Sequence, residues 1–165
     1  MTLKVECDAE GWPDPVNWDD LAERAVKAAT AASPYAPMLT ENYSACVSVK
    51  LADNDEVQAL NRQFRQKDRP TNVLSFPMVQ EDLLEAMSNS DDGEVLVGDI
   101  ILAHGVTEAE AADKGITLEA HATHLIVHGM LHLLGYDHEV NDAEAEHMES
   151  LETKALASLG LPDPY

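Results

Sequence analysis

The sequence feature that most constrains the fold is a set of three histidines spaced as HxxxHxxGxxH, between His128 and His138. At about 100° per residue, His128 and His132 lie one turn apart on the same face of a helix. Gly135 favours the left-handed conformation that ends a helix, so the chain can turn back and bring His138 toward the same point. Three imidazoles can bind a zinc ion at roughly 2.0–2.1 Å and leave a fourth tetrahedral position open, as in catalytic zinc sites. We therefore predict one zinc ion per chain, bound by His128, His132 and His138.

The alternative explanation for these histidines is ordinary packing. It accounts for a lone histidine on an apolar helix face, but poorly for three at this spacing beside a helix-ending glycine. Imidazole also binds other divalent ions, so the spacing predicts a metal more directly than it predicts zinc.

Several other polar residues lie near this motif in the sequence. His121 and His124 extend the histidine stripe toward the N-terminus. Either they orient the metal ligands or contact substrate, or they are packing residues. Asp137 precedes the third predicted ligand, where it either accepts a hydrogen bond from a ligand's ring nitrogen or forms the turn. His104 and His147 lie in polar sequence, which favours solvent-exposed side chains.

The residue after the first histidine bears on the type of hydrolase. Zinc peptidases with this ligand spacing carry a glutamate there, which acts as the general base. Here the position is Gly129. Peptidase activity is therefore disfavoured, although a carboxylate from another part of the chain could substitute.

The distribution of charge indicates how a nucleic acid could bind. The net charge of −21 at pH 7 disfavours general attraction to nucleic acids or anionic membranes. Only ten lysines and arginines are present, yet four lie within eight residues: Arg62, Arg65, Lys67 and Arg69. Phosphodiester cleavage requires positive charge at the phosphate, and this cluster could supply it. The alternative is a solvated helix end, since basic residues near the C-terminus of a helix over 53–65 suit its dipole.

Hydrophobic periodicity predicts alternating strands and helices in a single domain over residues 1–165. The predicted strands are Leu3–Cys7, Ser44–Leu51, Asn72–Phe76 and Val95–Leu102. The predicted helices are Asn17–Ala32, Asp53–Arg65, Thr107–Lys114, Thr117–Leu134 and Asp142–Leu159. Thr107 is expected to cap its helix, with Glu110 completing a capping box. The acidic stretch 79–93 lacks a pattern and reads as an exposed loop.

Neither a signal peptide nor a membrane span is apparent, and the two cysteines form no disulfide framework. These features favour a soluble cytoplasmic protein without membrane partners.

Two long strings support a family assignment. FRQKDRPTNVLSFP begins at Phe64, and HGMLHLLGYDH begins at His128. Together with Gly98-Asp99-Ile100, Glu119-Ala120-His121 and a closing LPDPY, they resemble the YbeY family of endoribonucleases and rRNA maturation factors. The resemblance covers roughly residues 42–165 in the same order. The acidic stretch after Pro77 looks longer than is usual in the family, which bears on how RNA would approach from that side.

The resemblance implies an α/β (α+β) fold with a central mixed four-stranded sheet and about five helices. It implies a metal-dependent hydrolase that cleaves single-stranded RNA, with zinc on the three histidines and Arg65 as the catalytic arginine. Lys67 and Arg69 would help to bind substrate. The implied role is maturation of the 3′ end of small-subunit ribosomal RNA and ribosome quality control in the cytoplasm. The partners would be ribosomal RNA and ribosomal particles; DNA is not expected.

Two mechanistic routes and two rival functions stay open from the sequence. Either water or the RNA 2′-OH could attack the phosphate. The rivals are a zinc metallopeptidase-like hydrolase lacking the helix glutamate, and a non-catalytic ribosome-assembly factor stabilised by zinc.

Overall fold

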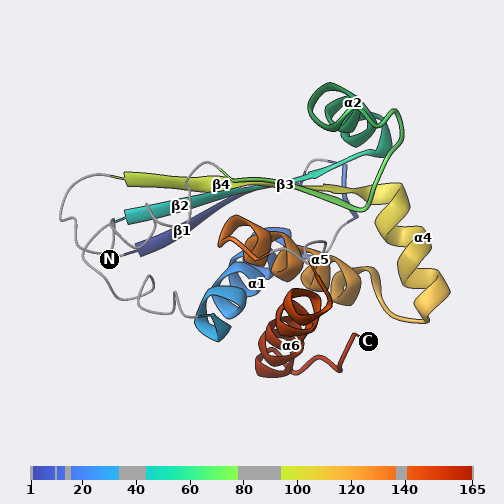
Figure 1. Ribbon diagram of the computed structural model, residues 1–165. Helices are drawn as coiled ribbons and strands as arrows, with labels where there is room; N and C mark the ends of the chain where they lie inside the picture. Colours follow the sequence, from blue (N-terminus) through green and yellow to red (C-terminus); the bar gives the residue numbers. More distant parts are fainter. Residues whose placement is uncertain are drawn as a thin grey trace.

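The computed structural model describes residues 2–9, 11–13, 16–33, 44–77, 94–136 and 141–164. Their four strands form one mixed sheet in the order β1–β2–β4–β3 (Figure 1). The strands are β1 (Thr2–Asp8), β2 (Ser44–Ala52), β3 (Val73–Pro77) and β4 (Glu94–Ala103). The first two strands and β4 run parallel, whereas β3 is antiparallel to β4. In this sheet β3 occupies one edge.

The described residues contain five helices: α1 (Trp18–Ala32), α2 (Asn54–Arg65), α4 (His104–Lys114), α5 (Leu118–Leu133) and α6 (Asp142–Ser158). Figure 1 shows α1, α5 and α6 on one side of the sheet, α2 on the other, and α4 beyond the end of β4. The fold class is therefore the expected one. Among the described helices, none combines the length and the apolar character needed to span a membrane.

Alternating side chains of β4 build a core on each face of the sheet. Ile100 and Leu102 belong to the larger core, which α1, α5 and α6 cover. Ile101 and Ala103 belong to a smaller core beneath α2. The predicted loop over 79–93 lies outside the described residues.

Helix α5 is the central helix, and its N-terminus forms as the sequence indicates. Thr117 caps it by accepting a hydrogen bond from the Ala120 N–H at 3.1 Å. The C-terminus is closed by Gly135, at φ 102°, with the Tyr136 N–H donating to the Leu131 carbonyl at 3.0 Å. Because most of its residues are buried, the helix is held firmly by packing, which suits a helix that holds site residues.

One predicted boundary is wrong. Helix α4 begins at His104, directly after β4, and Thr107 lies inside it, donating its hydroxyl to the Ala103 carbonyl at 2.7 Å. Instead, the backbone N–H of Val106, in the first turn of α4, donates a hydrogen bond to the side-chain oxygen of Asn54, on α2, at 3.1 Å. Because this cap comes from a residue 52 positions away, the local sequence pattern does not reveal it.

Candidate functional site

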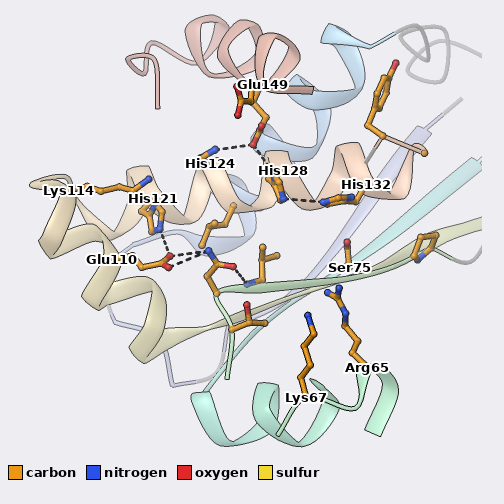
Figure 2. Close-up of a pocket in the computed structure, with 18 of the residues that line it drawn as sticks. Arg65, Lys67, Ser75, Glu110, Lys114, His121, His124, His128, His132 and Glu149 are labelled. Atoms are coloured by element: carbon orange, nitrogen blue, oxygen red, sulfur yellow. Dashed lines mark hydrogen bonds and ion pairs between the residues drawn. The ribbon is translucent and has the colours of Figure 1, made fainter. Parts of the chain in front are cut away.

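A cleft of about 870 Å³ lies between α5 and the edge strand β3. Figure 2 shows the histidines of α5 along one wall, with Arg65 and Lys67 reaching in from the opposite side and Glu110 and Lys114 at one end. Side chains alternate between the two faces along β3. Val73, Ser75 and Pro77 therefore line the cleft, whereas Leu74 and Phe76 belong to the core beneath α2. A cleft of this volume lies in the upper range of small-ligand sites.

The rings of His128 and His132 face each other through their Nε2 atoms. Their Nε2 atoms are 3.1 Å apart (Figure 2). Two imidazole ligands of one tetrahedral zinc would hold these nitrogens about 3.3 Å apart, given bonds of roughly 2.0–2.1 Å. The pair therefore fits a shared metal ion.

The other residues predicted for the metal region, His138 and Asp137, lie outside the described residues. Within the ranges that the structure describes, no group of three metal-binding side chains is assembled. The complete set of three histidine ligands therefore stays a prediction.

A buried carboxylate on α6 holds the first of these histidines. One oxygen of Glu152, Oε1, lies 2.9 Å from His128 Nδ1 and 3.0 Å from His124 Nε2. The Glu152 side chain is only 1% exposed. An ionised carboxylate only accepts hydrogen bonds, so His128 donates from Nδ1 and keeps a lone pair on Nε2 in its neutral form. Glu152 thus selects the tautomer that a metal ligand requires.

Glu152 is not among the residues predicted from the sequence, although the sequence contains a signal for it. The buried face of α6 is otherwise formed by Met148, Leu151, Ala155 and Leu156. Glu152 lies on this same face, where a charged residue is rare unless it is paired. A carboxylate on the apolar face of an amphipathic helix therefore indicates a buried polar partner.

His121 occupies the other end of the histidine stripe. Its Nε2 atom lies 2.9 Å from Glu110 Oε1 on α4, and its side chain is 2% exposed. The same Glu110 oxygen accepts a hydrogen bond from Asn72 Nδ2 at 3.1 Å. Burial lowers the pKa of His121, with the Glu110 carboxylate acting in the opposite direction, so the ring is held neutral.

The position of Gly129 bears on the peptidase alternative. Gly129 is buried and faces β4, where a Cβ atom would lie 2.9 Å from Ile100 Cγ2. A glutamate at this position would point into the sheet and away from the histidines. The absence of a side chain instead permits close packing of α5 on β4.

The predicted catalytic arginine and one of the two predicted substrate-binding cations line the cleft. Arg65 and Lys67 contribute to the cleft wall, whereas Arg69 is not among the lining residues of the cleft. Arg65 is the last residue of α2, and the loop that carries Lys67 and Arg69 begins at Gln66, in the left-handed conformation at φ 56°. Buried Asn61 holds this loop through two hydrogen bonds. Its side-chain amide donates to the Arg69 carbonyl at 2.9 Å, and its backbone carbonyl accepts from the Lys67 N–H at 3.2 Å. Lys67 therefore projects from an anchored loop, and Arg65 from the helix end that precedes it.

The two histidines expected to be solvated differ in their surroundings. His147 is exposed. His104 is half-buried instead, with its ring against Trp12 and its Nε2 3.2 Å from a Glu108 oxygen.

Comparison with known proteins gives a consistent result across the chain. The family model described as endoribonuclease YbeY matches residues 9–160. Endoribonuclease YbeY of Rhizorhabdus wittichii is 62% identical over 164 residues, covering 99% of this chain and 96% of that protein. The protein of the same name from Sphingopyxis alaskensis is 56% identical, covering 99% of this chain and 97% of its own length. A Thermotoga maritima protein with a solution structure shares the fold, with a TM-score of 0.54 at 24% identity, over 96% of this chain and 92% of that one.

Proposed function

Because the chain belongs to the YbeY family of endoribonucleases, we propose that it is a zinc-dependent enzyme that cleaves single-stranded RNA. We further propose that it acts in the cytoplasm on ribosomal RNA and ribosomal particles, in maturation of the small-subunit RNA 3′ end and in ribosome quality control. One observation carries the proposal. The His128–His132 pair and the cations Arg65 and Lys67 line the same cleft, on opposite walls.

The cationic wall suits a phosphate. The planar guanidinium of Arg65 can donate two parallel hydrogen bonds to phosphate oxygens, and Lys67 adds a second positive charge. Donors fixed in advance at a phosphate stabilise the negative charge that develops in the transition state. Arg65 is therefore the proposed catalytic arginine, and Lys67 a substrate-binding residue. Arg69 would contribute only long-range attraction from outside the cleft lining.

The histidine wall suits the metal. His128 and His132 would hold zinc together with His138, and Glu152 keeps His128 in the required tautomer. When bound, zinc supplies Lewis-acid polarisation of a phosphoryl oxygen. The placement of the ligands opposite Arg65 would bring both sources of positive charge to one phosphate.

The first test combines metal analysis with an RNA cleavage assay on the full chain. A labelled single-stranded RNA with the small-subunit 3′-end sequence should be cut, and a chelator should stop the reaction. A fully base-paired version should resist cleavage. Cleavage that continues in chelator, or equal cleavage of the paired RNA, would contradict the proposal.

The matched variants Arg65→Ala and Arg62→Ala test whether cleavage depends on Arg65 itself or on the overall positive charge of α2. Both remove one positive charge from α2, but only Arg65 lines the cleft. Arg65→Ala should keep bound zinc and lose at least about 100-fold in cleavage rate, because a transition-state contact is lost. Arg62→Ala should retain most activity. Equal losses in the two variants would assign the effect to net charge.

The end groups of the products distinguish the two routes of attack. Attack by the 2′-OH leaves a 2′,3′-cyclic phosphate, whereas direct attack by water leaves a linear phosphate. Mass spectrometry of a short cleaved RNA measures this directly.

A further inference from the structure

The α4 end of the cleft contains a second carboxylate, Glu110, that the proposed chemistry does not use. Its side chain is 37% exposed and lines the cleft, while His121 and Asn72 donate to its Oε1 atom at 2.9 and 3.1 Å. Figure 2 shows these contacts at the opposite end of α5 from His132. The seven residues from His121 to His128 correspond to about 10 Å along the helix axis. Glu110 therefore lies too far from the predicted metal site to act as a ligand there.

This carboxylate keeps acceptor capacity toward the cleft. An ionised carboxylate offers about four lone-pair positions. His121 and Asn72 use Oε1, whereas Oε2 has one long contact of 3.5 Å to Asn72 Nδ2. The two donors fix the carboxylate through Oε1, so a ligand that binds Oε2 meets an acceptor already in place. Because burial keeps His121 neutral, the negative charge of Glu110 is not cancelled by its partner.

A donor lies beside this acceptor. Lys114 is four residues further along α4 and also lines the cleft. Side chains four residues apart on a helix are neighbours, with Cβ atoms about 5–6 Å apart. Across the part of the chain that the structure describes, Lys114 has no ion-pair partner. The α4 end of the cleft therefore presents a fixed acceptor next to a flexible donor.

This arrangement suits a base better than a phosphate. Glu110 and nearby Asp113 repel phosphate, whereas Arg65 and Lys67 attract it to the other wall. Unpaired RNA bases are read by hydrogen bonds on their Watson–Crick edges. Cytosine and adenine present an amino donor beside a ring-nitrogen acceptor, which complements Glu110 beside Lys114. Uracil lacks the exocyclic amino group and offers Glu110 only its single ring N–H, between two carbonyl acceptors.

We propose that Glu110 and Lys114 form a subsite for an unpaired cytosine or adenine next to the cleaved phosphate. Glu110 accepts from the exocyclic amino group and Lys114 donates to the neighbouring ring nitrogen. His121 and Asn72 position Glu110 through their hydrogen bonds to its Oε1 atom. The inference rests on the proposed RNA cleavage and adds a base preference to it.

The test is a competition between two RNAs in one tube. Ten-nucleotide oligocytidylate and oligouridylate, each with its own dye, are cleaved together by the zinc-loaded full chain. The ratio of their kcat/KM values does not depend on how much enzyme is folded or loaded. The wild-type ratio should favour cytidylate by about 10-fold, the size of one hydrogen bond to a charged group.

The matched variants are Glu110→Gln and Glu108→Gln. Both remove one negative charge from α4, but Glu108 pairs with His104 and is not among the residues described as lining the cleft. Glu110→Gln should bring the ratio close to one, because an amide can either accept or donate, whereas Glu108→Gln should retain the preference. Lys114→Met provides a second variant and should lower the ratio about threefold.

Each outcome is decisive. A wild-type ratio near one, a preference that survives Glu110→Gln, or equal loss in Glu108→Gln would overturn the subsite while leaving RNA cleavage intact. Failure to cleave either RNA would overturn the proposed function and the subsite with it.

Discussion

Helix α5 supplies the histidines of two carboxylate–histidine units, whose carboxylates come from α6 and α4 and differ in exposure. Glu152 is 1% exposed and gives one oxygen to both His124 and His128. Glu110 is 37% exposed and gives one oxygen to His121 and Asn72. A buried carboxylate can act only through the side chains it holds, whereas a half-exposed one can also meet a ligand. The same chemical pair thus serves positioning at one end of the cleft and recognition at the other.

The largest expected effect follows from removing the buried carboxylate. Glu152→Ala should weaken zinc binding about 10–100-fold, because His128 loses the partner that fixes its tautomer and orientation. Unfolding free energy should fall by about 3 kcal/mol, since two buried ring N–H groups lose their acceptor. Zinc affinity is measured by competition with a chromophoric chelator, and stability by chemical denaturation.

Two further variants sharpen this result. Glu152→Gln keeps an acceptor oxygen and should recover part of the zinc affinity. Glu149→Gln alters another cleft-lining carboxylate on the same helix and should leave zinc affinity nearly unchanged. A zinc affinity that is the same in Glu152→Ala and wild type would remove the positioning role.

Removing the half-exposed carboxylate should affect zinc affinity and stability much less than removing Glu152. Glu110→Ala should change zinc affinity by less than about twofold, because about 10 Å of helix and ionic screening separate it from the metal ligands. Its stability cost should be about 1 kcal/mol, reduced by solvent access. The same chelator competition and denaturation measurements apply. Loss of zinc affinity comparable to that of Glu152→Ala would break the distinction between the two units.

The smallest effect is a pH dependence at His121. Its folded-state pKa lies below the ordinary value of 6.5, because burial disfavours the charged ring. The unfolded chain therefore binds this proton more readily, so stability is lost as pH falls below about 6.5. In His121→Gln, the difference in unfolding free energy between pH 7.5 and pH 5.5 should be smaller than in wild type. An unchanged or steeper pH profile in the variant would contradict a neutral, buried His121.

The sequence predicts those parts of the site whose geometry is local. The His128–His132 pair follows from helical periodicity, and all of the predicted strands and helices are present because their hydrophobic patterns are unambiguous. Partners supplied by other elements are not predicted in this way. Glu152 lies 24 residues from His128, and Asn72 lies 38 residues from Glu110, so only the fold brings them together. Glu110 was assigned to a local cap, whereas the structure directs it into the cleft.

The missing side chain at Gly129 has a consequence for the distance between the two walls of the cleft. Alanine at this position would place a methyl group 2.9 Å from Ile100 Cγ2, and relief of that contact would lift α5 away from the sheet. The histidines lie on α5, whereas Arg65 lies at the end of α2, so lifting α5 would draw the Nε2 atoms of His128 and His132 away from the guanidinium. Glycine at position 129 thus keeps α5 close enough to the sheet for the proposed zinc ion and Arg65 to reach the same phosphate.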